Sequence, residues 1–194
     1  LRSVVKAIYK TLKHTEKYMS IQYDYIHEIL PADIYFITSQ ELEDLYPNLT
    51  PKEREYENVR EKGAVFLMQI GDLLKSGEPH DGRAPDYDDW KLNGDIIVYY
   101  PVLDIALELS SMGIRVDAES LAVQLKKSRC EERARLPFQK SVLDGTLPLT
   151  IGGGIGQSRL CMFFLRKAHI GEVQCSIWPK ESVEVTDAVG IQLL

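Results

Sequence analysis

The sequence predicts an α+β domain in which a mixed or antiparallel sheet is flanked by helices. Its expected strands come in runs and do not alternate strictly with helices, which disfavours a doubly wound parallel sheet. Two of them, at residues 95–102 and 106–116, follow each other closely, as antiparallel neighbours do. A glycine-rich strand then leads directly into an apolar helix. With 194 residues, the chain is long enough for one domain with a real core.

The chain opens with a helical pattern. Apolar residues recur at helical spacing from Val5 to Ile29, and Pro31 is expected to end this helix. Residues 33–38 form a short apolar run, which predicts a buried strand.

Capping residues mark the next two helices. Thr38 with Glu41, and Thr50 with Glu53, each have the spacing of a capping box, in which both side chains bond backbone N–H groups. Gly63 fits the end of the second of these helices, because glycine adopts a positive φ at little cost.

The rest of the chain combines strands, helices and one long loop. The expected elements are a core strand at 64–71, a polar loop at 72–94, the strands at 95–102 and 106–116, helices near 118–127 and 134–144, a strand that passes into a helix over 152–168, and a closing strand at 172–179. A loop of this length inside a compact domain is usually functional or mobile.

Composition narrows the class of function. The formal net charge is -6, with 23 basic against 29 acidic residues, which argues against non-specific binding to nucleic acid. Cys130, Cys161 and Cys175 form no C-x-x-C pair, so reduced thiols in a cytoplasmic protein are expected. No apolar stretch reaches the roughly 18 residues of a membrane helix. No signal peptide is recognisable, and the absence of an initiator Met predicts a fragment or a processed chain.

Residues 150–160, TIGGGIGQSRL, form the first candidate site. The run is not a dinucleotide fingerprint, because Gln157 and Arg159 stand where the last glycine is required, and it lacks the lysine of a P-loop. Glycines let a flat group lie on the backbone, the start of the following helix offers free N–H groups, and Arg159 has a fork suited to a phosphate. The alternative is a glycine strand packed under a helix, with Arg159 on the surface.

The strand ALELSSMGIRV carries two charges in an apolar context. Strict alternation places Glu108, Ser110 and Met112 on one face, and Leu107, Leu109 and Ser111 on the other. A bulge or kink at Gly113 could return Arg115 to the face of Glu108. Such charges are expected to be paired or bound to a ligand, and a Glu108–Arg115 salt bridge stays open as the alternative.

The polar segment HDGRAPDYDDW is the third candidate site. Its polar residues are His80, Asp81, Arg83, Asp86, Asp88 and Asp89. The carboxylates suit Mg²⁺ or an ammonium group better than zinc, since thiols are absent and only one histidine is near. The alternative is a solvated acidic loop, and His80 by itself is expected to be an ordinary loop histidine.

These three stretches, in this order, resemble the family of ammonia-dependent asparagine synthetases, the aspartate–ammonia ligases. The segments that carry the resemblance are SQELEDLYP, GAVFLMQIG, HDGRAPDYDDW, LNGDIIVYYPVLDIALELSSMGIRVD and LPLTIGGGIGQSRLCMFFLRKAHIGEVQCSIWP. That family is similar to the catalytic cores of aspartyl- and asparaginyl-tRNA synthetases. The resemblance implies the class II synthetase fold, usually as a homodimer, with GGGIGQSRL as motif 3 of that class.

The reaction implied by the resemblance joins L-aspartate, ammonia and ATP to give asparagine, AMP and pyrophosphate through a β-aspartyl-adenylate. Arg159 then corresponds to the arginine that binds the γ-phosphate, and Gly154 and Gly156 to the positions on which adenine and ribose lie. Glu108 is similar to the carboxylate that holds Mg²⁺, with Asp95 as a second acidic group. The tRNA synthetases have an aspartate where this chain has Pro101, so the metal arrangement differs.

Other residues are implied at the aspartate. Arg115 resembles the synthetase arginine that clamps the side-chain carboxylate, and the nearby Ser110 and Ser111 could hydrogen-bond substrate or metal-bound water. Asp88 is expected to bind the α-ammonium, and Arg83 a carboxylate. No side-chain nucleophile is needed, because catalysis would come from alignment of the reactants and from neutralising phosphate charge.

The chain departs from the family pattern in two places. The family has a longer loop between the positions of Trp90 and Leu92, and it has motifs 1 and 2 in an upstream segment. Residues 1–194 are therefore expected to be a single, partial catalytic core that is weak or inactive by itself. A core that charges tRNA, and a non-catalytic module that keeps the nucleotide pocket, stay open as alternatives.

Overall fold

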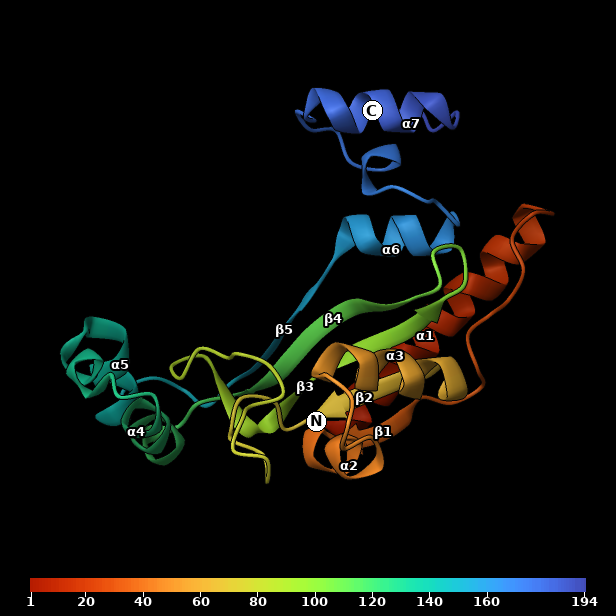
Figure 1. The fold of residues 1–194 in the computed structure, drawn as a ribbon. Helices are drawn as coiled ribbons and strands as arrows, with labels where there is room; N and C mark the ends of the chain where they lie inside the picture. The colour runs from red at the N-terminus through yellow and green to blue at the C-terminus, as the bar shows by residue number, and fades with distance from the viewer.

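The computed structural model describes residues 1–194 and confirms the α+β prediction (Figure 1). Its helices are α1 (Arg2–Gln22), α2 (Ser39–Leu45), α3 (Pro51–Lys62), α4 (Ala118–Lys127), α5 (Pro137–Leu143), α6 (Gln157–Phe164) and α7 (Lys180–Ala188). Its strands are β1 (Tyr35–Thr38), β2 (Ala64–Met68), β3 (Asp88–Tyr100), β4 (Ile105–Arg115) and β5 (Ile151–Ile155). They form one sheet in the order β1-β2-β3-β4-β5, in which only β1 and β2 are parallel.

Helices cover both faces of this sheet. On one face, α1 and α6 pack against the strands through a core of 17 buried residues that includes Val5, Phe66 and Phe163. On the other face, α2 and α3 cover the β1–β3 end through a smaller cluster that includes Val59 and Ile97. No helix combines the length and the apolar character of a membrane span.

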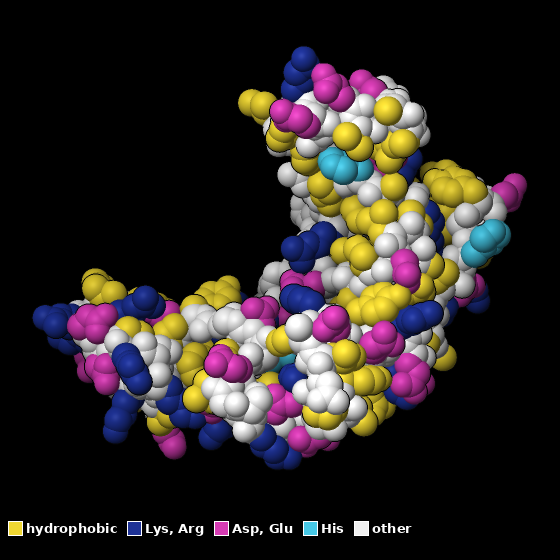
Figure 2. Space-filling model, in the orientation of Figure 1, with side chains coloured by type: hydrophobic (Ala, Val, Ile, Leu, Met, Phe, Trp, Pro, Cys, Tyr) yellow, Lys and Arg dark blue, Asp and Glu magenta, His cyan; other side chains and the backbone are white.

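The outer helices give the molecule a hollowed shape. α4 and α5 lie beside one end of the long β3–β4 pair, while α6 and α7 lie towards its other end (Figure 1). The space-filling view shows a wide concavity between these two parts (Figure 2). The second face of the sheet is open at Gly154 of β5, where an added Cβ would meet no atom within 4 Å. This open face is the site face described below.

Both capping boxes are confirmed. The hydroxyl of Thr38 accepts the N–H of Glu41 at 3.1 Å, and the hydroxyl of Thr50 accepts that of Glu53 at 3.4 Å. In return, each glutamate accepts the N–H of its threonine at 2.8 Å. Gly63 ends α3 with a φ of 76°, as expected.

The prediction for the first thirty residues was wrong in its second half. α1 ends at Gln22, and Tyr23 is already extended. The chain then returns along α1, where Ile26 is buried. Pro31 therefore does not end this helix, because long-range contacts have ended it nine residues earlier.

Three other boundaries also differ from the sequence prediction. β3 begins at Asp88, so the expected loop at 72–94 is shorter. The helix expected at 134–144 divides into a 3₁₀ turn, Glu131–Arg135, and α5, because Pro137 opens a new helix. The closing strand expected at 172–179 is absent, since this segment lies beyond α6 and away from the sheet.

A register shift in the β3–β4 pair decides which side chains share a face. Ile96 pairs with Ser110 and Ile97 pairs with Glu108, so Leu109 is an extra residue in β4. This bulge reverses the alternation of the strand. Glu108 and Ser111 therefore share the site face, whereas Ser110 lies on the other face. The expected grouping of Glu108 with Ser110 and Met112 was wrong, because strict alternation cannot contain an extra residue.

A buried ion pair connects α1, near the start of the chain, to the segment that follows α6. Glu16 of α1 is fully buried, and its carboxylate accepts the N–H groups of Ile29 and Leu30 at 3.0 Å each. Arg166, which follows α6, lies 2.8 Å from the same carboxylate and donates to the carbonyl of His27. The pair thus explains the path of the returning segment and holds α6 against α1.

We expect Glu16→Gln to lower the free energy of unfolding by about 3 kcal/mol, because it leaves the Arg166 charge buried without a counter-charge. Urea unfolding followed by circular dichroism measures this change. The matched control is Glu28→Gln, because Glu28 is an exposed partner of Lys13 at 2.9 Å in the same region. Equal effects of the two substitutions would contradict the role given to the buried pair.

Candidate functional site

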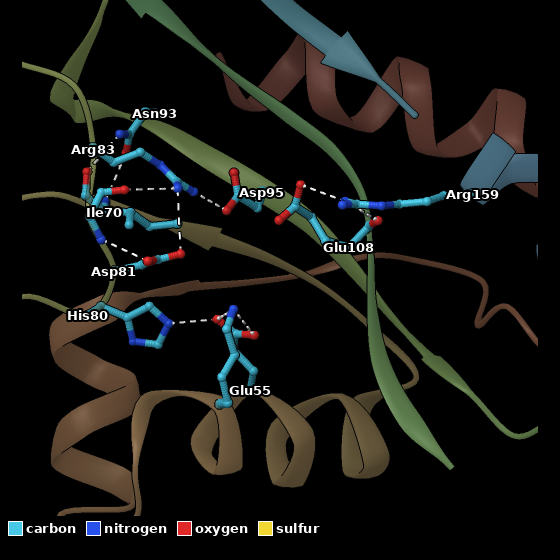
Figure 3. Close-up of polar contacts among 11 residues, drawn as sticks. Glu55, Ile70, His80, Asp81, Arg83, Asn93, Asp95, Glu108 and Arg159 are labelled. Carbon is cyan, nitrogen blue, oxygen red and sulfur yellow. Dashed lines mark hydrogen bonds and ion pairs between the residues drawn. The ribbon is translucent and has the colours of Figure 1, made fainter. Parts of the chain in front are cut away.

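A row of six charged side chains lies on the site face of the sheet. In order, its members are Arg159, Glu108, Asp95, Arg83, Asp88 and Arg115. Three ion pairs connect them: Arg159 with Glu108, Arg83 with Asp95, and Arg115 with Asp88. Neighbouring pairs also interact. Burial raises the pKa of both Asp95 and Asp88; the charge of Glu108 adds to this effect at Asp95, and the charge of Arg83 opposes it at Asp88. Figure 3 shows the first four members, with the carboxylate of Glu108 directed toward Asp95 and that of Asp95 directed toward Arg83. We call this set the charge row.

Arg159 and Glu108 form the exposed end of the charge row. Arg159 lies in the first turn of α6, and its Nη1 atom is 3.1 Å from a carboxylate oxygen of Glu108 and 3.2 Å from its carbonyl oxygen. The groove beside this pair has a volume of about 480 Å³ and is also lined by Lys52 and Glu55 of α3. Arg159 is therefore accessible to a ligand, which fits both the proposed phosphate contact and the alternative of a surface arginine.

Asp95 lies at the centre of the charge row and is buried, with 4% of its surface exposed. Burial raises the pKa of its carboxyl to about 6, although the positive charge of Arg83 acts in the opposite direction. One carboxylate oxygen is paired with Arg83, whereas Oδ1 has no hydrogen-bond partner. A buried acceptor without a partner is costly, and it marks a place where a ligand would be stabilising.

Arg115 closes the other end of the charge row. It pairs with Asp88, and it does not form the Glu108 salt bridge that stayed open in the sequence. Burial raises the pKa of Asp88, against the lowering effect of Arg115. The guanidinium also stacks on the ring of Tyr87 at 3.9 Å and donates to its hydroxyl at 3.0 Å. Tyr87 had no role in the sequence prediction, although it is adjacent to Asp88.

The glycine strand forms the floor of the site. Gly152 and Gly154 lie on the site face, opposite Gly113 and Ser111 of β4. A Cβ on Gly154 would enter open space, whereas one on Gly152 would lie 2.4 Å from Nη2 of Arg115. Gly156 is the residue before α6 and lies next to the stem of Arg159. The site face is therefore flat and open at Gly154, which is what a planar ligand requires.

Of the two serines, the structure brings only Ser111 into the site. Ser111 is opposite Asp95, and its hydroxyl acts to lower the pKa of that carboxyl, against the larger effect of burial. The hydroxyl of Ser110 instead donates to the carbonyl of Gly154 at 3.0 Å from the other face. Ser110 thus holds the glycine strand against β4.

The HDGRAPDYDDW segment does not converge on a single metal position. Asp86 accepts from Gln139 of α5 at 2.6 Å, and Asp88 pairs with Arg115. Asp81 accepts the N–H of the adjacent Gly82, and Asp89, within β3, accepts that of Lys91. The solvated-loop alternative is also incomplete, because His80 is buried and lies 2.9 Å from Glu55 of α3. This anchor places Arg83 beside Asp95.

The centre of the charge row fits a hard divalent cation. Asp95 and Glu108 are neighbouring carboxylates whose like charges repel, and a cation beside both would stabilise each of them. Oxygen donors of this kind suit Mg²⁺. No three His, Cys, Asp or Glu side chains converge to hold a metal. The chain would thus supply two ligands and leave the others to phosphate and water, which is usual for Mg²⁺.

Comparison with known proteins gives a family match over residues 1–190, to the family described as aspartate–ammonia ligase. A Ruminiclostridium cellulolyticum protein named aspartate–ammonia ligase is 60% identical over the whole chain, and one from Clostridium perfringens strain 13 is 61% identical. The chain covers 58% of the length of each of these relatives.

The solved structures that resemble this chain include asparaginyl-tRNA synthetases. The enzyme of Entamoeba histolytica in complex with asparaginyl-adenylate is 14% identical, with a TM-score of 0.56 over 90% of this chain and 41% of that chain. The Pyrococcus horikoshii enzyme with the same ligand is 14% identical, with a TM-score of 0.53 over 89% of this chain and 42% of that chain. This likeness confirms the fold, that of a class II aminoacyl-tRNA synthetase catalytic core. The family match over nearly the whole chain, together with the high identity to its named members, shows that the chain belongs to the aspartate–ammonia ligase family.

Proposed function

We propose that this chain is part of an enzyme that makes L-asparagine from L-aspartate, ammonia and ATP, through a β-aspartyl-adenylate. The observation that carries the proposal is the charge row above an open glycine floor. Such a row offers separate positions for phosphates, for a cation and for a small dicarboxylate. The relatives named aspartate–ammonia ligase support the choice of reaction. The two neighbours with bound asparaginyl-adenylate support an adenylate on this fold.

The nucleotide would occupy the Arg159 end of the row. Adenine and ribose would lie on Gly154, where an added Cβ would meet no atom within 4 Å, and on Gly156, beside the stem of Arg159. The guanidinium of Arg159 would break its ion pair with Glu108 and bind the γ-phosphate instead. Mg²⁺, held by Asp95 and Glu108, would neutralise phosphate charge when bound.

The aspartate would occupy the Arg83–Arg115 end of the row. Each arginine suits a carboxylate, and Asp88 between them suits the α-ammonium. Ser111 lies between the two ends and could hydrogen-bond the substrate or a water on the metal. Ser110 contributes indirectly, through the carbonyl of Gly154.

The chemistry needs alignment more than a reactive side chain. A side-chain carboxylate oxygen of aspartate attacks the α-phosphorus, and pyrophosphate leaves. Ammonium loses a proton to water, and the resulting ammonia attacks the acyl carbon. The bond from this carbon to the phosphate oxygen breaks, AMP leaves, and the nitrogen loses a second proton to water as the amide forms. The charge row would hold the reactants in line and stabilise the developing phosphate charge.

The proposed activity belongs to the whole protein, since the chain spans 58% of the length of its relatives. We propose that residues 1–194 alone are weakly active or inactive. We also propose a cytoplasmic homodimer. Three unpaired cysteines support a reducing compartment, and the resemblance to class II synthetase cores supports the dimer.

The direct test is an assay of the intact protein with ATP, Mg²⁺, aspartate and ammonium. We expect equal amounts of asparagine, AMP and pyrophosphate. Aminoacylation of tRNA in place of free asparagine would replace this proposal with the tRNA-charging alternative. ATP binding without aspartate-dependent pyrophosphate exchange would indicate a non-catalytic module.

Two arginine substitutions should separate the two ends of the charge row. Arg159→Ala should raise the KM for ATP by about 10-fold or more, because it removes charged hydrogen bonds worth about 1.5–3 kcal/mol. Arg115→Lys should raise the KM for aspartate by a similar factor and leave that for ATP nearly unchanged, because lysine lacks the planar fork. Steady-state kinetics of both variants provide the measurement. Parallel loss of both affinities in either variant would count against the division.

Asp95→Asn should stabilise the ligand-free protein at neutral pH. The pKa of Asp95 is about 6 in the folded protein and 3.8 ordinarily, so the folded state binds the proton more tightly. Stability is therefore lost as the pH rises from about 4 to about 6, by up to about 3 kcal/mol. Urea unfolding of both proteins at pH 4.5 and pH 7.5 tests this. The variant's advantage should be larger at pH 7.5, and an advantage that does not depend on pH would refute the argument.

A further inference from the structure

Helix α1, which packs on the face of the sheet opposite the site face, carries a line of basic side chains. Successive members are three or four residues apart, so they lie along one side of the helix. They are Arg2, Lys6, Lys10, Lys13 and Lys17. All except Lys13 are exposed, and only Lys13 forms an ion pair. From Arg2 to Lys17 the line runs for about 22 Å. We call this set the basic stripe.

A groove lies beside the basic stripe, between α1 and the segment that leads into β1. It has a volume of about 380 Å³, and Lys6, Lys10 and Lys13 line it together with His14. Its only acidic residue is Asp33. The basic side chains are thus gathered around a hollow in the surface, and such a concentration of one charge favours an anionic partner.

Three exposed tyrosines lie at the end of this helix and just beyond it. Tyr18, Tyr23 and Tyr25 have 62%, 46% and 58% of their surface exposed, respectively. The rings of Tyr23 and Tyr25 lie 6.1 Å apart. Because Tyr18 directly follows Lys17, the aromatic group continues the basic stripe.

This combination selects one class of anionic partner. A basic groove follows the phosphates of a single strand of nucleic acid, and exposed aromatic rings stack on its bases. An anionic membrane fits less well, because the apolar side of α1, including Val5 and Leu12, is buried in the core and cannot enter the acyl chains. An acidic peptide would pair with the lysines but leave the tyrosines unused. Asp33 favours RNA over DNA, because its carboxylate can accept a hydrogen bond from a 2′-hydroxyl.

We infer that the basic stripe and the three tyrosines bind single-stranded RNA, an activity separate from the proposed synthesis of asparagine. The net charge of -6 is a sum over the whole chain, and it disfavours binding away from the stripe. The stripe and the charge row share no residue and lie on opposite faces of the sheet, so RNA bound at α1 leaves the charge row free.

The test measures the affinity of the intact protein for a fluorescent oligouridylate of about 12 nucleotides, by fluorescence anisotropy at several salt concentrations. If about four phosphates are neutralised, the association constant should fall about 50-fold between about 50 and 200 mM salt. Lys6→Gln combined with Lys10→Gln should weaken binding by about 10-fold or more at low salt and reduce the log–log salt slope by about 1.4. Tyr18→Leu should weaken binding by about 5-fold or more without changing that slope, because it removes stacking and no charge.

The matched control is Lys126→Gln combined with Lys140→Gln, which removes the same charge from exposed positions on α4 and α5. This control should bind like the wild type, and equal losses in the two double variants would show only general attraction and overturn the inference. Equally tight binding of an oligodeoxythymidylate would overturn the choice of RNA. Asparagine synthesis should be unchanged in the stripe variants, so a failure of the proposed function leaves this test intact.

Other results would assign the surface to another partner. Retention of the intact protein on phosphatidylserine vesicles, without binding of the oligouridylate, would indicate a membrane. Polyglutamate that competes as well as unlabelled oligouridylate, with no effect of Tyr18→Leu, would indicate an acidic protein segment. Absence of any binding to the oligouridylate would also refute the inference.

Discussion

The site depends on one irregularity in the sheet, the extra residue at Leu109 of β4. Without it, Glu108 and Ser111 would point to opposite faces, because side chains alternate strictly along a regular strand. With it, Leu107, Leu109 and Met112 all reach the core, while Glu108 and Ser111 reach the site face beside Asp95. One strand thereby contributes both to the largest core cluster and to the charge row. Bulges next to functional sites commonly redirect side chains in this way.

The charge row also destabilises the ligand-free folded protein. Asp95 is buried with one oxygen unpaired, Glu108 adds a like charge beside it, and Asp88 is desolvated as well. The three arginines offset part of this cost, but each also keeps a partly exposed guanidinium that a ligand can reach. A bound cation would neutralise the remaining carboxylate charge, and bound phosphates would pair with the exposed guanidinium groups. The rest of the fold must therefore carry the stability, and the buried Glu16–Arg166 pair and the core of α1 and α6 lie on the opposite face.

Local signals in the sequence predicted local structure well. Capping boxes at Thr38 and Thr50 and the turn at Gly63 depend on neighbours within a few residues, and all three are confirmed. The end of α1 and the missing strand at 172–179 depend on distant partners, which no local pattern contains. The same holds for the site. The sequence indicated which side chains are present, but a one-residue bulge decided their faces, and pairing across β3 and β4 gave Arg115 to Asp88 and not to Glu108.

The glycine run illustrates how far a motif can be interpreted. In the sequence, Gly152, Gly153 and Gly154 are equivalent, and all suit a backbone that approaches a phosphate. In the structure, Gly153 is exposed on the face opposite the site, where its Cβ would lie 2.6 Å from Cβ of Met112. Gly152 makes room for an arginine of the protein itself, and only Gly154 opens onto free space. The three glycines thus have three different surroundings, and each position excludes or admits a side chain for a different reason. A run that resembles one binding loop is better understood as a strand whose glycines pack against Met112, make room for Arg115 and leave space for the proposed nucleotide.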